Sequence, residues 1–311
     1  LYMYFLPTLI VVLISLIYMF IGFLLGKTKK VTTDNLKVLS TILIYVCGPC
    51  MVINSFLNVD FDKQTALNML YFFLVTFALQ ILFGLLMVFI LRKHLSNNKV
   101  RVLCACSICG NVGFFGLPLI QALYPNEPIV MAYSSIFVMT MNIVIFTFGT
   151  YCITNDKKHI SIKKALLNPT TIAMYISLPL FFLKINSNML GEFSIIFSLL
   201  AKMTTPICMI MLGCRLAYAN FKNLFNRSFV YIACIVKLII FPLISYLIIY
   251  FIPFFDDVFK ASIFVLTACP SAALVASIAE LYQIEEENAA NVVLFSTVIC
   301  VITLPLLMLI L

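Results

Sequence analysis

Apolar residues recur along the chain in blocks of about twenty, and short polar segments separate these blocks. An α-helix of about twenty residues crosses the roughly 30 Å hydrocarbon core of a bilayer. The pattern therefore predicts an all-α polytopic membrane protein with ten transmembrane helices. The predicted spans are about 4–25, 36–57, 66–91, 100–123, 128–152, 167–184, 193–218, 228–251, 258–282 and 288–311.

Composition leaves no room for a sizeable soluble domain. Of the 311 residues, 63% are hydrophobic and 10% are charged, whereas soluble domains carry about 45–50% apolar and about 25% charged residues. The first block is too long for the core of a signal peptide and lacks a small-residue cleavage pattern. We expect it to remain as a span.

The net charge of +8 does not indicate nucleic-acid binding, because the basic residues lie in short loops on alternate sides of the apolar blocks. Fifteen follow spans one, three, five and seven, and three lie in the opposite loops. By the positive-inside rule, this predicts a multi-pass protein of the plasma (cytoplasmic) membrane with both termini on the non-cytoplasmic side. The fifteen are Lys27, Lys29, Lys30, Lys37, Arg92, Lys93, Lys99, Arg101, Lys157, Lys158, Lys163, Lys164, Arg215, Lys222 and Arg227, and the three are Lys63, Lys184 and Lys260.

The stretch from Cys109 to Ile120 interrupts the fourth span with three glycines, one proline and one asparagine. Glycine and proline weaken a helix interior, and proline also removes a backbone donor. Hydrocarbon tolerates the freed N–H and C=O groups only where protein or a water-filled cavity satisfies them. We therefore expect this break to form half of a transport site. The alternative is a proline kink that serves packing alone.

Two halves of the chain carry matching features. Pro49 in span two has a counterpart 157 residues later in Pro206, and Ile120–Tyr124 has one 158 residues later in Ile278–Tyr282. The same offset lays the broken stretch of span four over Cys269–Ala273 in span nine. Paired interruptions in two inverted repeats are the best sequence pointer to the binding site of a transporter.

The repeats define the expected domain organisation. Each copy holds five predicted spans, so the second copy must enter the membrane upside down relative to the first. The first five-helix repeat is expected over residues 1–154 and the second, inverted repeat over residues 155–311.

Several segments resemble those of the auxin efflux carrier family, which includes bacterial permeases for malate and malonate and the plant PIN auxin carriers. The resemblance covers essentially the whole chain and keeps the order of the segments. They are the broken span Asn111–Leu119, the proline-to-glycine stretch Pro206–Gly213, the ninth-span segments Ala268–Ala273 and Ala279–Tyr282, and Thr303–Pro305 near the end of the last span.

The resemblance implies a fold and a way of working. Spans one, two, six and seven would form a scaffold, and the other six a moving unit in which broken spans four and nine cross beside the substrate. It also raises dimerisation through the scaffold as an option. The chain is similar to the compact prokaryotic form, since only about Thr154–Lys164 joins the repeats. Gly110 and Val275 stand where the plant pattern has prolines, which puts a plant-like auxin specificity in doubt.

The broken spans suit an anionic substrate, because a helix N-terminus carries about half a positive charge and unpaired N–H groups. Half-helices starting after Asn111 and after Pro270 would aim such ends at the middle of the membrane. Asn111 and Ser271 would cap these ends or bind the substrate directly, and Gly113 and Pro118 complete the expected substrate-binding set on span four.

Polar side chains elsewhere in the spans are further candidates. Lys237 lies deep in span eight, where a charge is costly and is usually functional or paired. It would attract the anion or titrate, or else extend to a nearby interface, which is the better interpretation for Lys202. Gln80 is its counterpart in the first repeat, and Asn54 is a third candidate. Asn142 and Asn291 either line the pathway or form hydrogen bonds between helices.

The sequence offers little chemistry for an enzyme, a metal or a cofactor. Cys47-Gly48-Pro49-Cys50 has redox-motif spacing, but its apolar helical flanks favour a proline kink with packed thiols. Three further cysteines, Cys104, Cys106 and Cys109, have no histidine or carboxylate nearby in the sequence. Both histidines lie in loops. We therefore expect no enzyme and no cofactor.

The leading hypothesis is a secondary transporter of a small organic anion, such as a dicarboxylate or an auxin-like carboxylate, that works by an elevator-type movement. No nucleotide-binding motif and no mid-span carboxylate occur in the sequence. The alternatives are a carrier of the bile-acid/sodium symporter type and a membrane receptor that binds without transport. The coupling ion stays open between a proton, sodium and none.

Overall fold

The computed structural model describes residues 2–218 and 228–311, apart from the side chains at positions 2–4, 33 and 118. Every regular element in these ranges is helical, and one isolated antiparallel bridge joins Gly110 to Ser271. The all-helical prediction is thus confirmed. Lys222 and Arg227, which contributed to the predicted orientation, lie outside the described residues.

Eight helical segments in the described ranges are long and apolar enough to cross a membrane. They are Phe5–Lys27, Asp34–Leu57, Lys63–His94, Ile129–Thr154, Lys157–Phe182, Glu192–Tyr218, Ser228–Tyr250 and Glu286–Leu307. The spans predicted at 100–123 and 258–282 do not form continuous helices, because an extended segment divides each of them into shorter ones. The count of ten spans stays a prediction.

The first half of the chain forms α1 (Tyr2–Lys27), α2 (Thr33–Ile42), η1 (Leu43–Cys47), α3 (Gly48–Leu57), α4 (Lys63–Leu91), η2 (Arg92–His94), α5 (Asn98–Ile108), η3 (Val112–Gly116), α6 (Leu117–Leu123), α7 (Ile129–Val144), η4 (Ile145–Gly149), α8 (Thr150–Thr154) and η5 (Lys157–His159). The second half forms α9 (Ile162–Leu166), α10 (Pro169–Phe182), α11 (Ser187–Leu190), α12 (Glu192–Tyr218), α14 (Ser228–Ile235), η6 (Val236–Ile240), α15 (Phe241–Tyr250), α16 (Asp257–Thr267), α17 (Ala273–Leu281) and α18 (Glu286–Leu307).

Proline explains three wide π-helical turns in this list. The turns η1, η3 and η6 each lead directly into a helix that carries proline in its first two positions, namely Pro49, Pro118 and Pro242. Proline has no N–H to donate and its ring crowds the preceding turn, so the helix widens there instead of continuing regularly. Cys47 and Cys50 lie at the first of these turns as free thiols inside helical structure.

The charged start of α4 lies outside the apolar part of its span. Asp62 accepts hydrogen bonds from the amides of Gln64 and Thr65 and from the Thr65 hydroxyl. The Thr65 hydroxyl is the main cause that holds the pKa of Asp62 below its ordinary value. A depressed pKa means that this cap stabilises the fold at neutral pH, and that its contribution is lost as the pH falls through the folded-state pKa.

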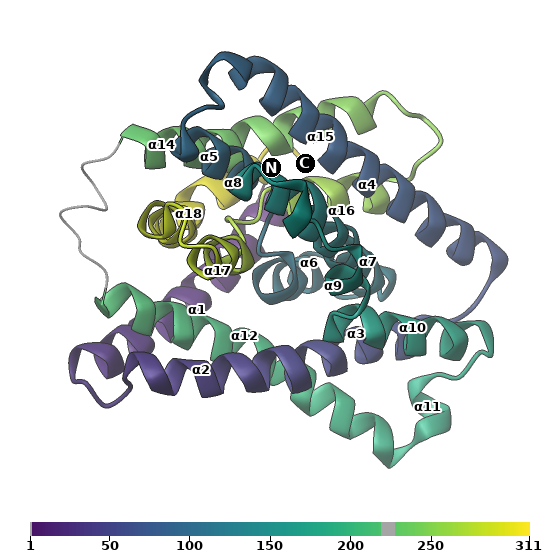
Figure 1. Ribbon diagram of the computed structural model, residues 1–311. Helices are drawn as coiled ribbons and strands as arrows, with labels where there is room; N and C mark the ends of the chain where they lie inside the picture. Colours follow the sequence, from purple (N-terminus) through teal and green to yellow (C-terminus); the bar gives the residue numbers. More distant parts are fainter. Residues whose placement is uncertain (1, 219–227) are drawn as a thin grey trace.

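The helices group into two sides with a core between them. Figure 1 shows α2, α3, α10 and α12 along one side and α4, α14 and α15 along the other, with α6, α7, α16 and α17 between. Burial follows this order. The segment containing α7 is 78% buried in its most apolar window, against 28% for those of α1 and α12. A helix that is apolar all round and buried belongs to the interior, whereas the outer helices expose an apolar face.

Helices α1 and α12 touch backbone to backbone. A side-chain carbon added at Gly22 would lie 2.0 Å from the carbonyl oxygen of Ile210, and one added at Gly213 would lie 1.9 Å from that of Met19. The Cys214 thiol donates to the Gly22 carbonyl across 3.1 Å. Small residues permit such close approach in membrane helix pairs.

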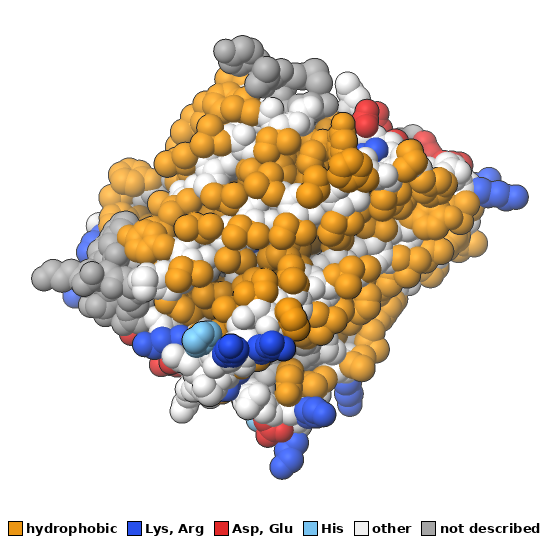
Figure 2. All heavy atoms as spheres, turned by 90° about the horizontal axis from the view of Figure 1, so that it is seen from above, with side chains coloured by type: hydrophobic (Ala, Val, Ile, Leu, Met, Phe, Trp, Pro, Cys, Tyr) orange, Lys and Arg blue, Asp and Glu red, His pale blue; other side chains and the backbone are white. Residues whose placement is uncertain are grey.

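The outer surface has the character of a lipid-facing one. Figure 2 shows a face made almost entirely of apolar side chains, with Lys and Arg gathered mainly along one margin. Large apolar side chains such as Phe20, Leu82 and Phe251 are at least 59% exposed. Within the described residues only one ion pair forms, between Lys37 and Asp34 at 3.1 Å. This surface, rather than a charged one, fits burial in a bilayer.

Candidate substrate site at the helix crossing

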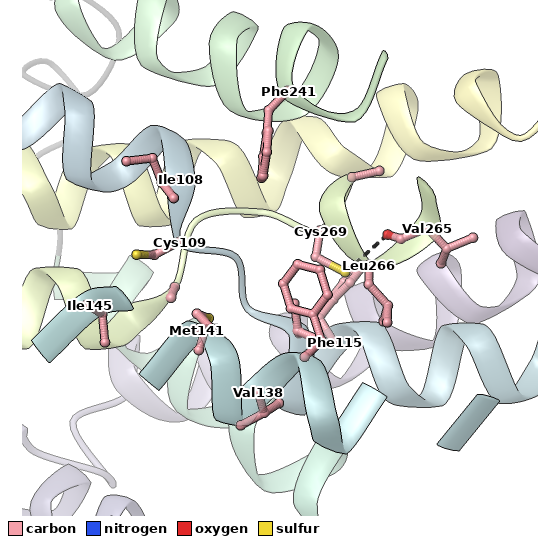
Figure 3. Packing of buried hydrophobic residues seen from close by; sticks show 14 of the residues in the cluster. Ile108, Cys109, Phe115, Val138, Met141, Ile145, Phe241, Val265, Leu266 and Cys269 are labelled. Carbon is pink, nitrogen blue, oxygen red and sulfur yellow. Dashed lines mark hydrogen bonds between the residues drawn. The ribbon is translucent and has the colours of Figure 1, made fainter. Parts of the chain in front are cut away.

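The two breaks cross and satisfy each other's backbone. The amide of Asn111 donates to the Pro270 carbonyl across 2.6 Å, and the amide of Ala272 donates to the Cys109 carbonyl across 3.0 Å. Figure 3 shows the chain leaving Cys109 and the chain leaving Cys269 running past each other. Each break frees main-chain groups at membrane depth, and the other break supplies partners for them.

Ser271 forms two hydrogen bonds at the crossing. Its hydroxyl donates to the Cys106 carbonyl across 2.9 Å, and its amide donates to the Ser296 hydroxyl across 3.1 Å. The side chain is fully buried and lines none of the cavities described below. The structure therefore gives Ser271 and Pro270 contacts within the crossing itself.

Two half-helices begin at the crossing, and neither has a side-chain cap. The turn η3 starts after Asn111 and α17 starts after Ala272, and no side chain bonds to the first amides of either. The leading N–H groups of a helix lack partners within it and carry partial positive charge. The two ends are thus open to an acceptor.

Both half-helix ends face one cavity of about 170 Å³, which we name the crossing cavity. Gly110–Phe114 and Ala272–Leu274 form one part of its wall. Helices α3, α7, α10 and α12 and the residue before α10 supply much of the rest, including Met51, Asn142, Asn168, Thr170, Met211 and Arg215.

The wall of the crossing cavity is mainly apolar, with a few polar side chains among the apolar ones. Asn111 is 4% exposed and its side chain adjoins the Cys208 thiol, but its nitrogen forms no hydrogen bond of normal geometry with the described residues. Asn142 donates to the Thr170 hydroxyl across 3.0 Å, and that hydroxyl donates to Asn168 across 2.8 Å. A buried amide donor without a partner is costly, so its retention beside a cavity points to a bound polar group.

Arg215 adds a cation that the sequence pattern hid. The positive-inside pattern counts it only as an orienting charge near the end of span seven, whereas in the structure it lies in the last turn of α12 and lines the crossing cavity. Across the described part of the chain it forms no ion pair. A guanidinium offers a planar fork of donors that matches a carboxylate.

Two larger cavities approach the crossing. The first, of about 890 Å³, is lined by Asp34, Lys37, Glu280 and Asn291, and shares Ser40 and Arg215 with the crossing cavity; we name it the vestibule. The second, of about 530 Å³, is lined by Asn54, Asn58, Glu127, Lys202 and Pro206, and shares Met51 with the crossing cavity; we name it the opposite cavity.

These cavities locate several expected site residues. Asn111 and Gly113 line the crossing cavity, and Asn54 lines the opposite cavity. Pro118 lies in the first turn of α6, and its side chain is outside the described part. Lys202 is exposed and lines the opposite cavity; its extension to the membrane interface stays a prediction.

Gln80 lies away from all three cavities. It is fully buried, and its amide nitrogen donates to the Thr140 hydroxyl across 2.9 Å. Its amide oxygen has no partner among the residues described. Its position places it in the packing between α4 and α7.

Lys237 does not extend to an interface. The whole residue is 0% exposed, and its ammonium donates to the Thr267 carbonyl across 2.8 Å. The Phe241 ring lies beneath it with its centroid 4.9 Å away. A side-chain carbon added at Gly110 would lie 3.1 Å from the ammonium nitrogen. Lys237 thus touches the crossing beside Gly110 and lines none of the three cavities.

Within residues 2–218 and 228–311, no group of three or more His, Cys, Asp or Glu side chains is arranged to hold a metal ion. Cys104, Cys106 and Cys109 are buried free thiols.

Comparison with known proteins covers nearly the whole chain. The sequence profile described as membrane transport protein matches residues 7–308. An uncharacterized transporter from Methanocaldococcus jannaschii is 24% identical over 302 residues, which is 95% of this chain and 96% of that protein. Both matches span the two breaks and the crossing cavity.

Proposed function

The chain belongs to the membrane transport protein family, the auxin efflux carrier family, and from this premise we propose that it is a secondary transporter of a small organic anion. The substrate class is a dicarboxylate or an auxin-like carboxylate. The carrier works by an elevator-type movement of the unit that contains the crossing.

The crossing cavity carries this proposal. Two half-helix N-termini without a side-chain cap among the described residues line the same small space as Asn111 and Arg215, whose side chains carry an amide donor and a guanidinium. Each helix end favours a nearby anion by about 0.3–1 kcal/mol, and a hydrogen bond to a charged group contributes about 1.5–3 kcal/mol. All these groups are donors, so the site selects an acceptor.

The size of the cavity narrows the substrate class. Pockets for drug-sized ligands have volumes of about 300–1,000 Å³, whereas the crossing cavity has about 170 Å³. This favours a short dicarboxylate over an indole-type acid.

Alternating access follows from the proposed architecture. Residues 1–154 and 155–311 are two inverted five-helix repeats with ten spans in all, and both termini lie on the non-cytoplasmic side of the plasma membrane. The vestibule then opens toward the cytoplasm and the opposite cavity toward the other side. Met51, which lines both the crossing cavity and the opposite cavity, supports a thin barrier between them. The glycine contact of α1 with α12 suits a scaffold that stays fixed.

Reconstituted transport tests the proposal. Purified protein in liposomes would be assayed for uptake of labelled malate, malonate and indole-3-acetate, with and without a proton or sodium gradient. We expect saturable uptake of at least one dicarboxylate, reduced about 10–100-fold in Arg215→Gln, because one charged hydrogen-bonding group is lost. Lys93→Gln, which changes an exposed cation outside the cavities, is the matched control.

Other outcomes would overturn parts of the proposal. Strict dependence on a sodium gradient would favour a carrier of the sodium symporter type. Saturable binding of an anion without uptake would favour a receptor. Equal uptake by wild type and Arg215→Gln would remove the crossing cavity as the anion site.

A further inference from the structure

Lys237 is a buried cation without an anionic partner. It is 0% exposed, and the only ion pair in the described ranges joins Lys37 to Asp34. Removing an ammonium from water is unfavourable unless other groups replace its hydration. The neutral groups around Lys237 must therefore do so.

Those groups form a site with the character of a cation-binding site. The ammonium donates to the carbonyl of Thr267, the last residue of α16, so it sits at the negative end of that half-helix. Helix α5 ends at Ile108, just before Gly110, whose α-carbon leaves room for the ammonium. The Phe241 ring supplies an aromatic face 4.9 Å away, a common contact for cations.

The crossing thus presents partial charges of opposite sign to the crossing cavity and to Lys237. The half-helices that begin there, η3 and α17, aim positive ends at the crossing cavity. Of the half-helices that finish there, α16 presents its last carbonyl, that of Thr267, to Lys237, and α5 ends at Ile108, two residues before Gly110, which adjoins the ammonium. Carbonyl oxygens at unwound segments of membrane helices are typical ligands of monovalent cations.

We propose that the crossing contains a monovalent-cation site which this chain fills permanently with the ammonium of its own Lys237. The Thr267 carbonyl and the Phe241 ring are its ligands, and Gly110 is the residue that makes space for it. Lys237 is therefore a positioning residue for the crossing, and a variant without the ammonium regains an empty site for a free ammonium or alkali cation.

Thermal unfolding of purified protein tests the site without a transported substrate. Lys237→Ala opens the space, Lys237→Met fills it with an uncharged chain, and Lys93→Ala is the control. The melting temperature would be measured at constant ionic strength in choline chloride and with methylammonium, ammonium, sodium or potassium chloride added. Choline is too large for a site sized for a lysine ammonium.

We expect Lys237→Ala to melt below wild type in choline chloride and to gain at least about 3 °C, saturably, with methylammonium or one of the small cations. Wild type, Lys93→Ala and Lys237→Met should gain nothing beyond what choline gives. Uptake by Lys237→Ala should recover at least threefold with the same cation.

A gain shared by wild type or by Lys237→Met would overturn the proposal, as would the absence of any cation-specific gain in Lys237→Ala. If Lys237→Ala does not fold, a higher melting temperature of wild type in sodium or potassium chloride than in choline chloride still overturns the proposal, because a filled site admits no free cation. The thermal arm stands apart from the anion proposal, so either can fail while the other holds.

Discussion

Two places in this molecule bring distant stretches of backbone into contact, and they do so by opposite means. Where α1 meets α12, glycines on both helices let carbonyl oxygens approach within 2.0 Å of where a side chain would begin. Where the two breaks meet, the helices are interrupted and the backbones bond through Asn111 and Ala272. At the first contact both helices stay continuous. At the second, helical hydrogen bonds are replaced by hydrogen bonds between the two breaks.

The difference separates a contact that stabilises the fold from one that can bind a ligand. At the α1–α12 contact the helical hydrogen bonds are kept and close packing excludes other molecules. At the crossing, half-helix ends and the Asn111 nitrogen have no side-chain hydrogen-bond partner among residues 2–218 and 228–311, and they adjoin a cavity. Unpartnered groups weaken a fold but can recognise a ligand. Changes at the first contact should therefore affect stability, and changes at the second should affect transport.

The largest effect is expected at the glycine contact. Gly213→Val would place side-chain carbons 1.9 Å from the Met19 carbonyl, so the backbones would have to separate. Overpacking costs about 1–3 kcal/mol where side chains can adjust, and more where backbone must move. We expect little folded protein by size-exclusion chromatography and a strongly lowered melting temperature. Leu199→Val, on the exposed face of the same helix, should behave as wild type.

Asn111→Leu should reduce transport without reducing stability, in contrast to Gly213→Val. Uptake should fall about 10–100-fold, because a donor to a charged substrate is lost. The melting temperature should stay level or rise, since the side-chain nitrogen has no partner within the described part of the chain. Transport and unfolding would be measured on the same preparation, with the exposed Asn188→Ala as control. A matched loss of stability would show that Asn111 holds the crossing together instead.

Gly110→Ala is expected to have an intermediate effect. The added carbon would lie 3.1 Å from the Lys237 nitrogen, so the ammonium must shift away from Thr267. We expect a loss of about 1 kcal/mol in stability, in the range of one hydrogen bond. In the Lys237→Ala background the same change should cost almost nothing, and a double-mutant cycle of melting temperatures measures this coupling. Additive effects would separate Gly110 from Lys237.

The smallest effect is expected at the rim of the crossing cavity. Asn142→Ala removes the hydrogen bond to Thr170, which joins α7 to α10. Such bonds between membrane helices average about 0.6 kcal/mol, so uptake or the equilibrium constant of unfolding should change by about threefold at most. A change above tenfold in the apparent substrate affinity would make Asn142 a direct ligand.

The sequence predicted what the bilayer imposes. Apolar blocks predicted an all-helical membrane protein, whose described residues form eight helices long enough to span a bilayer. The glycines and prolines near Asn111 and Pro270 predicted where helices break, because hydrocarbon penalises every freed backbone group. Sequence could also favour an anion, since broken helices leave positive ends. These inferences need only local chemistry and the properties of the solvent.

What escaped prediction depends on distance in space. The sequence indicates only an orienting charge at Arg215, because it does not show that the end of α12 lines the crossing cavity. Sequence left open whether Lys237 attracts the anion, titrates or extends to an interface; its burial excludes the interface, and its hydrogen bond to a main-chain carbonyl is one that no residue pattern reveals. The Ser271 hydroxyl bonds to Cys106, 165 positions away in the chain, so its orientation could not be inferred.

The unpaired ammonium of Lys237 has a consequence for the membrane potential. If the crossing moves across the bilayer as proposed, this fixed positive charge moves with it in every cycle. With a dianionic cargo, the positive charge of Lys237 in the empty unit becomes a net negative charge in the loaded unit, so the membrane potential acts on the two with opposite signs. With a monoanionic cargo the two charges cancel, so the potential acts only on the empty unit. Each elementary charge carried across 100 mV changes the free energy by about 2.3 kcal/mol. Transport should therefore be electrogenic in a way that reports the valence of the cargo.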